Sequence, residues 1–103
     1  AKIHLLGVKQ ETLEHYGAVS EQTAREMVEG AIRMAKTDAA IAITGIAGPD
    51  GGTPAKPVGL VYIACHVQGK TIVKEYRFKG NRQKIREQSV IFALDLLRRQ
   101  ISN

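Results

Sequence analysis

Apolar residues recur at helical spacing before the middle of the chain. Ser20 is suited to cap the N-terminus of a helix, and Glu21 follows it where a negative charge favours the helix dipole. The pattern predicts an amphipathic helix over residues 21–35. Its apolar face comprises Ala24, Met27, Val28, Ala31, Ile32 and Ala35.

Two other segments also have helical character. Residues 2–17 are typical of one or two short helical turns that end at Gly17, because glycine readily adopts a positive φ after a helix. Asn81 is suited to cap a last helix over about residues 82–101. We expect this helix to cover a sheet with Ile85, Phe92, Ala93, Leu96 and Leu97.

Three shorter runs have the pattern of β-strands. AAIAIT (39–44) and VGLVYIACHV (58–67) are apolar without alternation, which is typical of strands buried on both faces. Apolar and polar residues alternate over 71–78, which predicts a half-covered strand near a sheet edge, where Lys74 is tolerated. Gln68-Gly69 can turn the chain between the last two strands, so we expect a hairpin there.

The order helix–helix–strand–strand–strand–helix predicts an α/β domain with helices on both faces of a mixed sheet. With 103 residues, the chain is one domain over 1–103 with a single core. Two strands buried on both faces need more neighbours than three strands provide. We therefore expect a further strand from the same gene product or from another copy, and a small three-stranded α+β domain is the alternative.

The formal net charge of +5 favours an anionic partner. The basic residues are spread along the chain, and no run of aromatic residues alternates with lysine or arginine as in single-strand binders. These features argue against nucleic acid and favour a phosphorylated small molecule.

Cysteine and histidine usage narrows the chemistry further. Cys65 is the single cysteine and lies in an apolar run, so we expect a buried, inert thiol and a reducing cytoplasmic location. His4, His15 and His66 lack metal-ligand spacing with each other and with Cys65, so we expect no metal. No apolar run is long enough for a membrane span, so we expect no membrane partner.

The stretch TGIAGPDGGTPAKP (44–57) gathers glycine and proline between two apolar runs. It holds Gly45, Gly48, Gly51 and Gly52, and all three prolines of the chain. Glycines let backbone N–H groups approach a ligand, and the hydroxyl of Thr44 lies where the preceding strand ends. We expect a ligand-binding loop, and a rigid connection without a ligand is the alternative.

Arg82 and Arg86 are four residues apart at the start of the last predicted helix, so they share a face. Arginine binds phosphate with two parallel hydrogen bonds. We expect at least one of the two to contact ligand, Arg86 above all; a solvated helix face is the alternative.

Three blocks of the sequence together resemble one known family. They are AKxxLLGVxxETLxxxGAVSExxAREMxEGA (1–31), TGIAGPDGGTPAKPVGLVYIA (44–64) and FxGxRxxIRxxxxxxALxLLR (78–98). In this order they resemble the C-terminal domain of CinA (competence/damage-inducible protein A) and the stand-alone nicotinamide-nucleotide amidases. The resemblance implies a three-layer α/β/α sandwich with a five-stranded mixed sheet.

The same resemblance implies an activity and its residues. The activity is hydrolysis of nicotinamide mononucleotide to nicotinic acid mononucleotide and ammonia, with no metal or organic cofactor. Lys2 matches the end of the family's lysine motif and would be the catalytic lysine, while Thr44 would contact substrate. The family's Glu-Ser-Cys-Thr-Gly-Gly motif, which carries the serine nucleophile, has no match in this chain.

Because the serine motif and two strands have no match, we expect a homo-oligomer or association with a missing N-terminal segment. Two other functions remain as alternatives: a non-catalytic domain that binds nucleotide or phosphate, and an oligomerising domain of a CinA-like protein.

Overall fold

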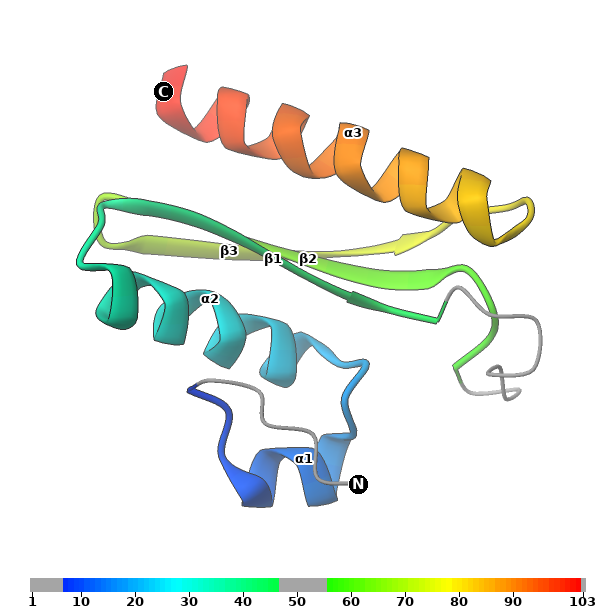
Figure 1. Cartoon of the computed structure of the whole chain (residues 1–103), viewed down its shortest axis with the longest axis horizontal. Helices are drawn as coiled ribbons and strands as arrows, with labels where there is room; N and C mark the ends of the chain where they lie inside the picture. Colours follow the sequence, from blue (N-terminus) through cyan, green and yellow to red (C-terminus); the bar gives the residue numbers. More distant parts are fainter. Residues whose placement is uncertain (1–6, 47–55, 103) are drawn as a thin grey trace.

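Three helices and one sheet make up the computed structural model, which describes residues 7–46 and 56–102. In chain order the elements are α1 (Gln10–Tyr16), α2 (Glu21–Ala35), β1 (Ala39–Gly45), β2 (Leu60–Val67), β3 (Lys70–Arg77) and α3 (Arg82–Ser102). Figure 1 shows the sheet as a middle layer, with α3 on one face and α2 and α1 on the other. The α/β class with helices on both faces of a sheet is confirmed.

The sheet is an antiparallel meander in the order β1-β2-β3. Gln68 and Gly69 form the turn between β2 and β3 with φ values of 49° and 85°, and positive φ at both positions suits a two-residue hairpin. The predicted hairpin is therefore confirmed. The three described strands all pair antiparallel, so the mixed character expected of the sheet is not found among them.

Side-chain caps begin the two long helices as expected. The Thr23 backbone N–H donates to Ser20 Oγ at 3.2 Å, and the Lys84 backbone N–H donates to Asn81 Oδ1 at 2.9 Å. Each cap satisfies one of the N–H groups that have no partner within the first helical turn. Among the described residues, no helix is long and apolar enough to cross a membrane.

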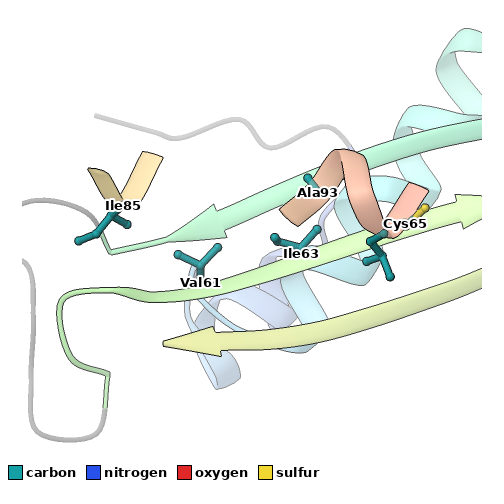
Figure 2. Packing of buried hydrophobic residues seen from close by; sticks show 6 residues of the cluster. Val61, Ile63, Cys65, Ile85 and Ala93 are labelled. Atoms are coloured by element: carbon teal, nitrogen blue, oxygen red, sulfur yellow. The ribbon is translucent and has the colours of Figure 1, made fainter. Parts of the chain in front are cut away.

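Strand β2 is buried on both faces and divides the core into two clusters. The cluster between the sheet and α3 comprises Val61, Ile63, Cys65, Ile85, Ala93 and Leu96. Figure 2 shows Val61, Ile63 and Cys65 on β2, with Ile85 and Ala93 on α3. The cluster between the sheet and α2 comprises Ala24, Val28, Ala42 and Ala64. Cys65 is fully buried, which confirms the expected environment, and burial raises the pKa of its thiol.

Strand β1 corrects one prediction, because it is not buried on both faces. Ala42 is its one buried residue, and Ile43 is 36% exposed. The physical reason is position: β1 has a single strand partner, β2, and lies at the edge of the described sheet. An apolar run without alternation does not distinguish such an edge strand from a central one.

The start of β2 also differs from the prediction, since the strand begins at Leu60 rather than at residue 58. Gly59, with φ 98°, precedes it. Its N–H donates to the Ile46 carbonyl oxygen at 2.7 Å, and its own carbonyl oxygen accepts from the Phe78 N–H at 2.8 Å. This glycine therefore joins the ends of β1, β2 and β3.

Gly59→Ala should strongly destabilise the fold. The added Cβ would lie 2.1 Å from the Phe78 carbonyl oxygen, at a φ that side chains rarely adopt. We expect a loss of at least about 1–3 kcal/mol of unfolding free energy, measured by urea denaturation. Gly69→Ala is the matched control, because φ is 85° there but no described atom lies within 4 Å of the added Cβ. An equal loss in both variants would contradict the steric explanation.

Candidate functional site

The predicted binding residues that the structure describes gather at one end of the sheet. At this end β1 finishes at Thr44 and Gly45, β3 finishes, and α3 begins at Arg82. Figure 1 shows these ends together, beside the point where the chain leaves β1 and returns to β2. Lys2, Gly48, Gly51 and Gly52 lie outside the described residues, so their roles stay predictions.

Thr44 has a structural partner at this end. Its Oγ1 donates a hydrogen bond of 2.7 Å to the carbonyl oxygen of Ala18, between α1 and α2. Thr44 shares the α2-facing side of β1 with Ala42, since alternate residues point to the same face. The hydroxyl therefore ties β1 to the segment before α2, and contact between Thr44 and a ligand stays a prediction.

Close packing explains why residue 45 is a glycine, and the sequence alone did not indicate this. An added Cβ would come within 2.7 Å of Val61 Cγ2 and 3.0 Å of the Leu60 carbonyl oxygen. The absence of a side chain therefore allows the close pairing of β1 with β2. Contact between Gly45 and a ligand stays a prediction.

Arg82 and Arg86 lie one turn apart on the first two turns of α3, and both are exposed. Neither forms an ion pair with another described residue. They border an open depression of about 820 Å³, whose described lining is Arg82, Gln83, Arg86, Glu87, Val90 and Ile91. Two unpaired guanidinium groups beside a depression can bind a phosphate.

The structure brings the arginines and Thr44 to the same end of the domain but into different layers. The arginines belong to the α3 layer, and the Thr44 side chain lies on the face that α2 covers. A ligand that contacted both would have to pass around the end of the sheet at β1.

Sequence reasoning missed a polar group on the α2-facing side of the same end. The Tyr62 hydroxyl donates to Glu75 Oε1 at 2.9 Å, and Arg77 pairs with Glu75 at 3.3 Å. Register places Tyr62 opposite Thr44 on one side and opposite Glu75 on the other. Burial, and then the hydrogen bond to Glu75, raise the pKa of Tyr62 above 10.0. In the sequence, only the alternation of polar and apolar residues in β3 indicated that Glu75 and Arg77 share one face of the sheet.

Lys56, near the C-terminal end of the glycine-rich segment, is bonded to the end of α1. Its Nζ donates to the Tyr16 carbonyl oxygen at the C-terminus of α1, where a positive charge is favoured by the helix dipole. The chain therefore leaves β1 beside Ala18 and returns beside Tyr16.

Histidine and cysteine lie apart as expected. Cys65 belongs to the cluster under α3, whereas His66 Nδ1 lies 2.7 Å from Thr71 Oγ1, and that hydroxyl donates to Glu29 of α2 at 3.3 Å. Within residues 7–46 and 56–102, no three His, Cys, Asp or Glu side chains are placed to share a metal ion. That the protein uses no metal stays a prediction.

Comparison with known proteins assigns the chain to one family. A family model described as the CinA C-terminal domain matches residues 1–101. A CinA-like protein of Kosmotoga olearia is 56% identical over 101 residues, covering 98% of this chain and 24% of that protein. A CinA-like protein of Syntrophomonas wolfei is 57% identical over 103 residues, covering 100% of this chain and 25% of that protein. The chain belongs to the CinA C-terminal domain family.

Solved structures agree with this assignment. A CinA superfamily protein from Escherichia coli has a TM-score of 0.86 and 43% identity, covering 90% of this chain and 54% of its own. The competence damage-inducible protein A from Klebsiella pneumoniae has a TM-score of 0.90 and 36% identity, covering 96% and 62%. The chain spans about a quarter of the length of the curated relatives it matches.

Thr44→Val should destabilise the domain without changing side-chain shape, because it removes the hydroxyl that bonds to the Ala18 carbonyl oxygen. We expect a loss of about 0.5–1.5 kcal/mol of unfolding free energy, the usual net contribution of such a bond, measured by urea denaturation. Thr44→Ser retains the hydroxyl and is the control. Stability of Thr44→Val at or above that of the unchanged chain would contradict the structural role.

Tyr62 should make stability fall at alkaline pH. Its pKa is raised in the folded chain above 10.0, so the folded chain holds the phenol proton more tightly than the unfolded chain does. This contribution is fully present below pH 10.0 and is lost as the pH rises through the folded-state pKa. Urea unfolding across this range should show a smaller alkaline loss for Tyr62→Phe. A residual loss is expected there, because burial also raises the pKa of Tyr76; identical slopes would contradict the contribution of Tyr62.

Proposed function

We propose that this domain serves the hydrolysis of nicotinamide mononucleotide to nicotinic acid mononucleotide and ammonia. The observation that carries the proposal is membership of the CinA C-terminal domain family over residues 1–101, joined to the resemblance of the glycine-rich segment to the family's amidases. The site supports it with Arg82 and Arg86, which form no ion pair with another described residue and lie at the end of the sheet where that segment begins.

In the proposed complex the chain's own groups bind and position the nucleotide. Arg86, with Arg82 one turn before it, holds the phosphate by charge-assisted hydrogen bonds. The glycines of the segment after β1 present backbone N–H groups. Thr44 Oγ1 donates to Ala18, so toward the ligand it acts as a hydrogen-bond acceptor.

The proposed chemistry is of the serine–lysine type. A serine hydroxyl attacks the carboxamide carbon while Lys2, held neutral, accepts its proton. The C–N bond then breaks, and ammonia leaves with that proton. Water hydrolyses the resulting acyl-serine ester, releasing the carboxylate product and restoring the serine. This chain contains no match to the serine motif, so the nucleophile has to come from a segment outside these 103 residues.

The lack of a match to the serine motif favours a second function. A domain with the arginines but without the serine motif would bind a nucleotide phosphate with no chemistry. The third alternative, an oligomerising domain, predicts no nucleotide binding. Titration and product analysis separate the three.

Calorimetric titration with nicotinamide mononucleotide should detect binding that depends on Arg86. We expect Arg86→Ala to weaken binding about tenfold or more, because a hydrogen bond to a charged group contributes about 1.5–3 kcal/mol. Arg25→Ala is the control: it removes the same charge from α2, where Arg25 pairs loosely with Glu21 at 4.0 Å. Nicotinamide riboside, which lacks the phosphate, should bind the unchanged chain and Arg86→Ala equally.

Release of ammonia then decides between catalysis and binding alone. The measurement uses the chain by itself and the chain with a separately supplied family segment that carries the serine motif. Ammonia together with nicotinic acid mononucleotide supports the amidase. Binding without ammonia in both mixtures supports the nucleotide-binding alternative, and absence of binding supports the oligomerising one.

A further inference from the structure

A second hollow lies between α3 and β3, toward the hairpin end of the domain. Figure 1 shows the β2–β3 hairpin and the C-terminal end of α3 together, at the end opposite to the start of α3. The hollow has a volume of about 390 Å³, which is within the range of small-molecule sites. Strand β3 contributes Lys70, Ile72 and Lys74 to its lining, and α3 contributes Leu96, Arg99 and Gln100. We call it the hairpin pocket.

Three cationic side chains line the hairpin pocket, and no acidic side chain of the described residues does. Lys70 and Lys74 share the α3-facing side of β3 with Tyr76, since alternate residues of a strand point to one face. Arg99 approaches from the helix. All three cations are exposed, and neither lysine forms an ion pair with another described residue. Positive charge therefore converges on the pocket from a strand and from a helix.

The acids near this end do not cancel that charge. Asp95 is shared by two arginines: its Oδ2 lies 2.9 Å from Arg99 Nε, and its Oδ1 lies 2.7 Å from Arg98 Nη2. Glu75 lies on the α2-facing side of the sheet, and Asp38 does not line the pocket. With the two lysines, four positive charges therefore stand against one negative charge. The contact through Nε also leaves both Nη nitrogens of Arg99 for a ligand.

A hydrogen bond between helix and strand holds the two walls of the pocket together. Gln100 Nε2 donates to the backbone carbonyl oxygen of Lys70 at 2.9 Å, which fixes the end of α3 over the start of β3. Leu96 is buried and Ile72 is half-buried, so the pocket has an apolar floor between its cationic walls. A site whose walls are already held in place loses less free energy when it orders around a ligand.

The number and placement of the cations indicate the kind of anion. A phosphate monoester carries a charge of about −1.5 to −2 at pH 7 and three acceptor oxygens. Lys70 and Lys74 are about 14 Å apart along the strand, and their flexible side chains can both turn toward the position over Ile72 between them. The planar guanidinium of Arg99 suits two phosphate oxygens at once. A carboxylate offers two oxygens and one negative charge, so it matches three cations less well.

We infer that the hairpin pocket binds a small phosphate monoester, with the phosphate held by Lys70, Lys74 and Arg99 and the organic part against the apolar floor. A bound dianion would also relieve the repulsion among the like charges that border the pocket. The pocket lies toward the opposite end of the sheet from Thr44 and Arg86. It is therefore a second site, and the inference does not depend on the proposed amidase activity.

Titration of the full 103-residue chain with phenyl phosphate tests the inference, with binding followed residue by residue through the NMR shifts of backbone amides. We expect saturable shifts at Gly69, Lys70 and Gln100. Arg86→Ala should leave them unchanged, which separates this pocket from the site at the other end. Phenol lacks the phosphate and inorganic phosphate lacks the organic part, so both should bind more weakly. Affinity should fall as salt is raised, because the cations are exposed.

Lys70→Gln and Lys74→Gln should each weaken binding of phenyl phosphate about tenfold, because each removes a hydrogen bond to a charged group. Both side chains are exposed, so the variants should keep the fold, which thermal unfolding checks. Lys79→Gln is the matched control: it removes the same charge from an exposed lysine that does not line the pocket.

Three results would overturn the inference. One is a folded chain whose amides at the pocket do not respond to phenyl phosphate, including a chain that binds only vesicles containing phosphatidic acid. Another is equal weakening by Lys79→Gln, which would indicate general attraction by the net charge. The third is inorganic phosphate that binds as tightly as phenyl phosphate, since the apolar floor would then have no role. None of these readouts involves nicotinamide mononucleotide or ammonia, so their failure is distinct from failure of the amidase proposal.

Discussion

Burial of β2 on both faces is the constraint on which the rest of the structure depends. Its side chains alternate between the cluster under α3 and the cluster under α2. Each helix layer is therefore anchored to the same strand, and both other strands pair with it. Removing apolar area from β2 would weaken both layers together, because both clusters include side chains of this strand.

This arrangement fixes where a binding site can lie. The faces of β2 are filled by side chains, so space for a ligand remains at the ends of the strands. At one end the Gln68-Gly69 hairpin closes the chain tightly. At the other end, Gly59 joins β1, β2 and β3 by two backbone hydrogen bonds, and α3 begins nearby with its exposed arginines. The glycine-rich connection between β1 and β2 is at this second end, as is the depression that Arg82 and Arg86 border.

Local chemistry made much of the fold predictable. The bounds of α2 follow from Ser20 and from one continuous apolar face, and the start of α3 follows from Asn81. The hairpin follows from a dipeptide that tolerates positive φ. The exposure of β1 could not be predicted in this way, because it depends on how many strands flank it, and AAIAIT has the same pattern at an edge and in the centre.

The candidate site was less predictable than the fold. The sequence indicated Thr44, Gly45, Arg82 and Arg86 as separate candidates for ligand binding, and the structure places them at one end of the sheet. The bond from Thr44 to Ala18 and the contact that Gly45 avoids with Val61 are tertiary features without a sequence signal. Lys2 and the other three glycines lie outside the described residues, so for them the resemblance remains the only guide.

The two long helices show why one face of a helix can be predicted and another cannot. In α2 Ala24 and Val28 lie on one face, which is buried against the sheet, while Met34 is 67% exposed. In α3 apolar residues occur on more than one side: Ile85, Ala93 and Leu96 are buried, while Val90, Leu94 and Ile101 are exposed. The apolar pattern alone therefore does not show which side of α3 packs on the sheet, and the structure shows that Ile85, Ala93 and Leu96 do so.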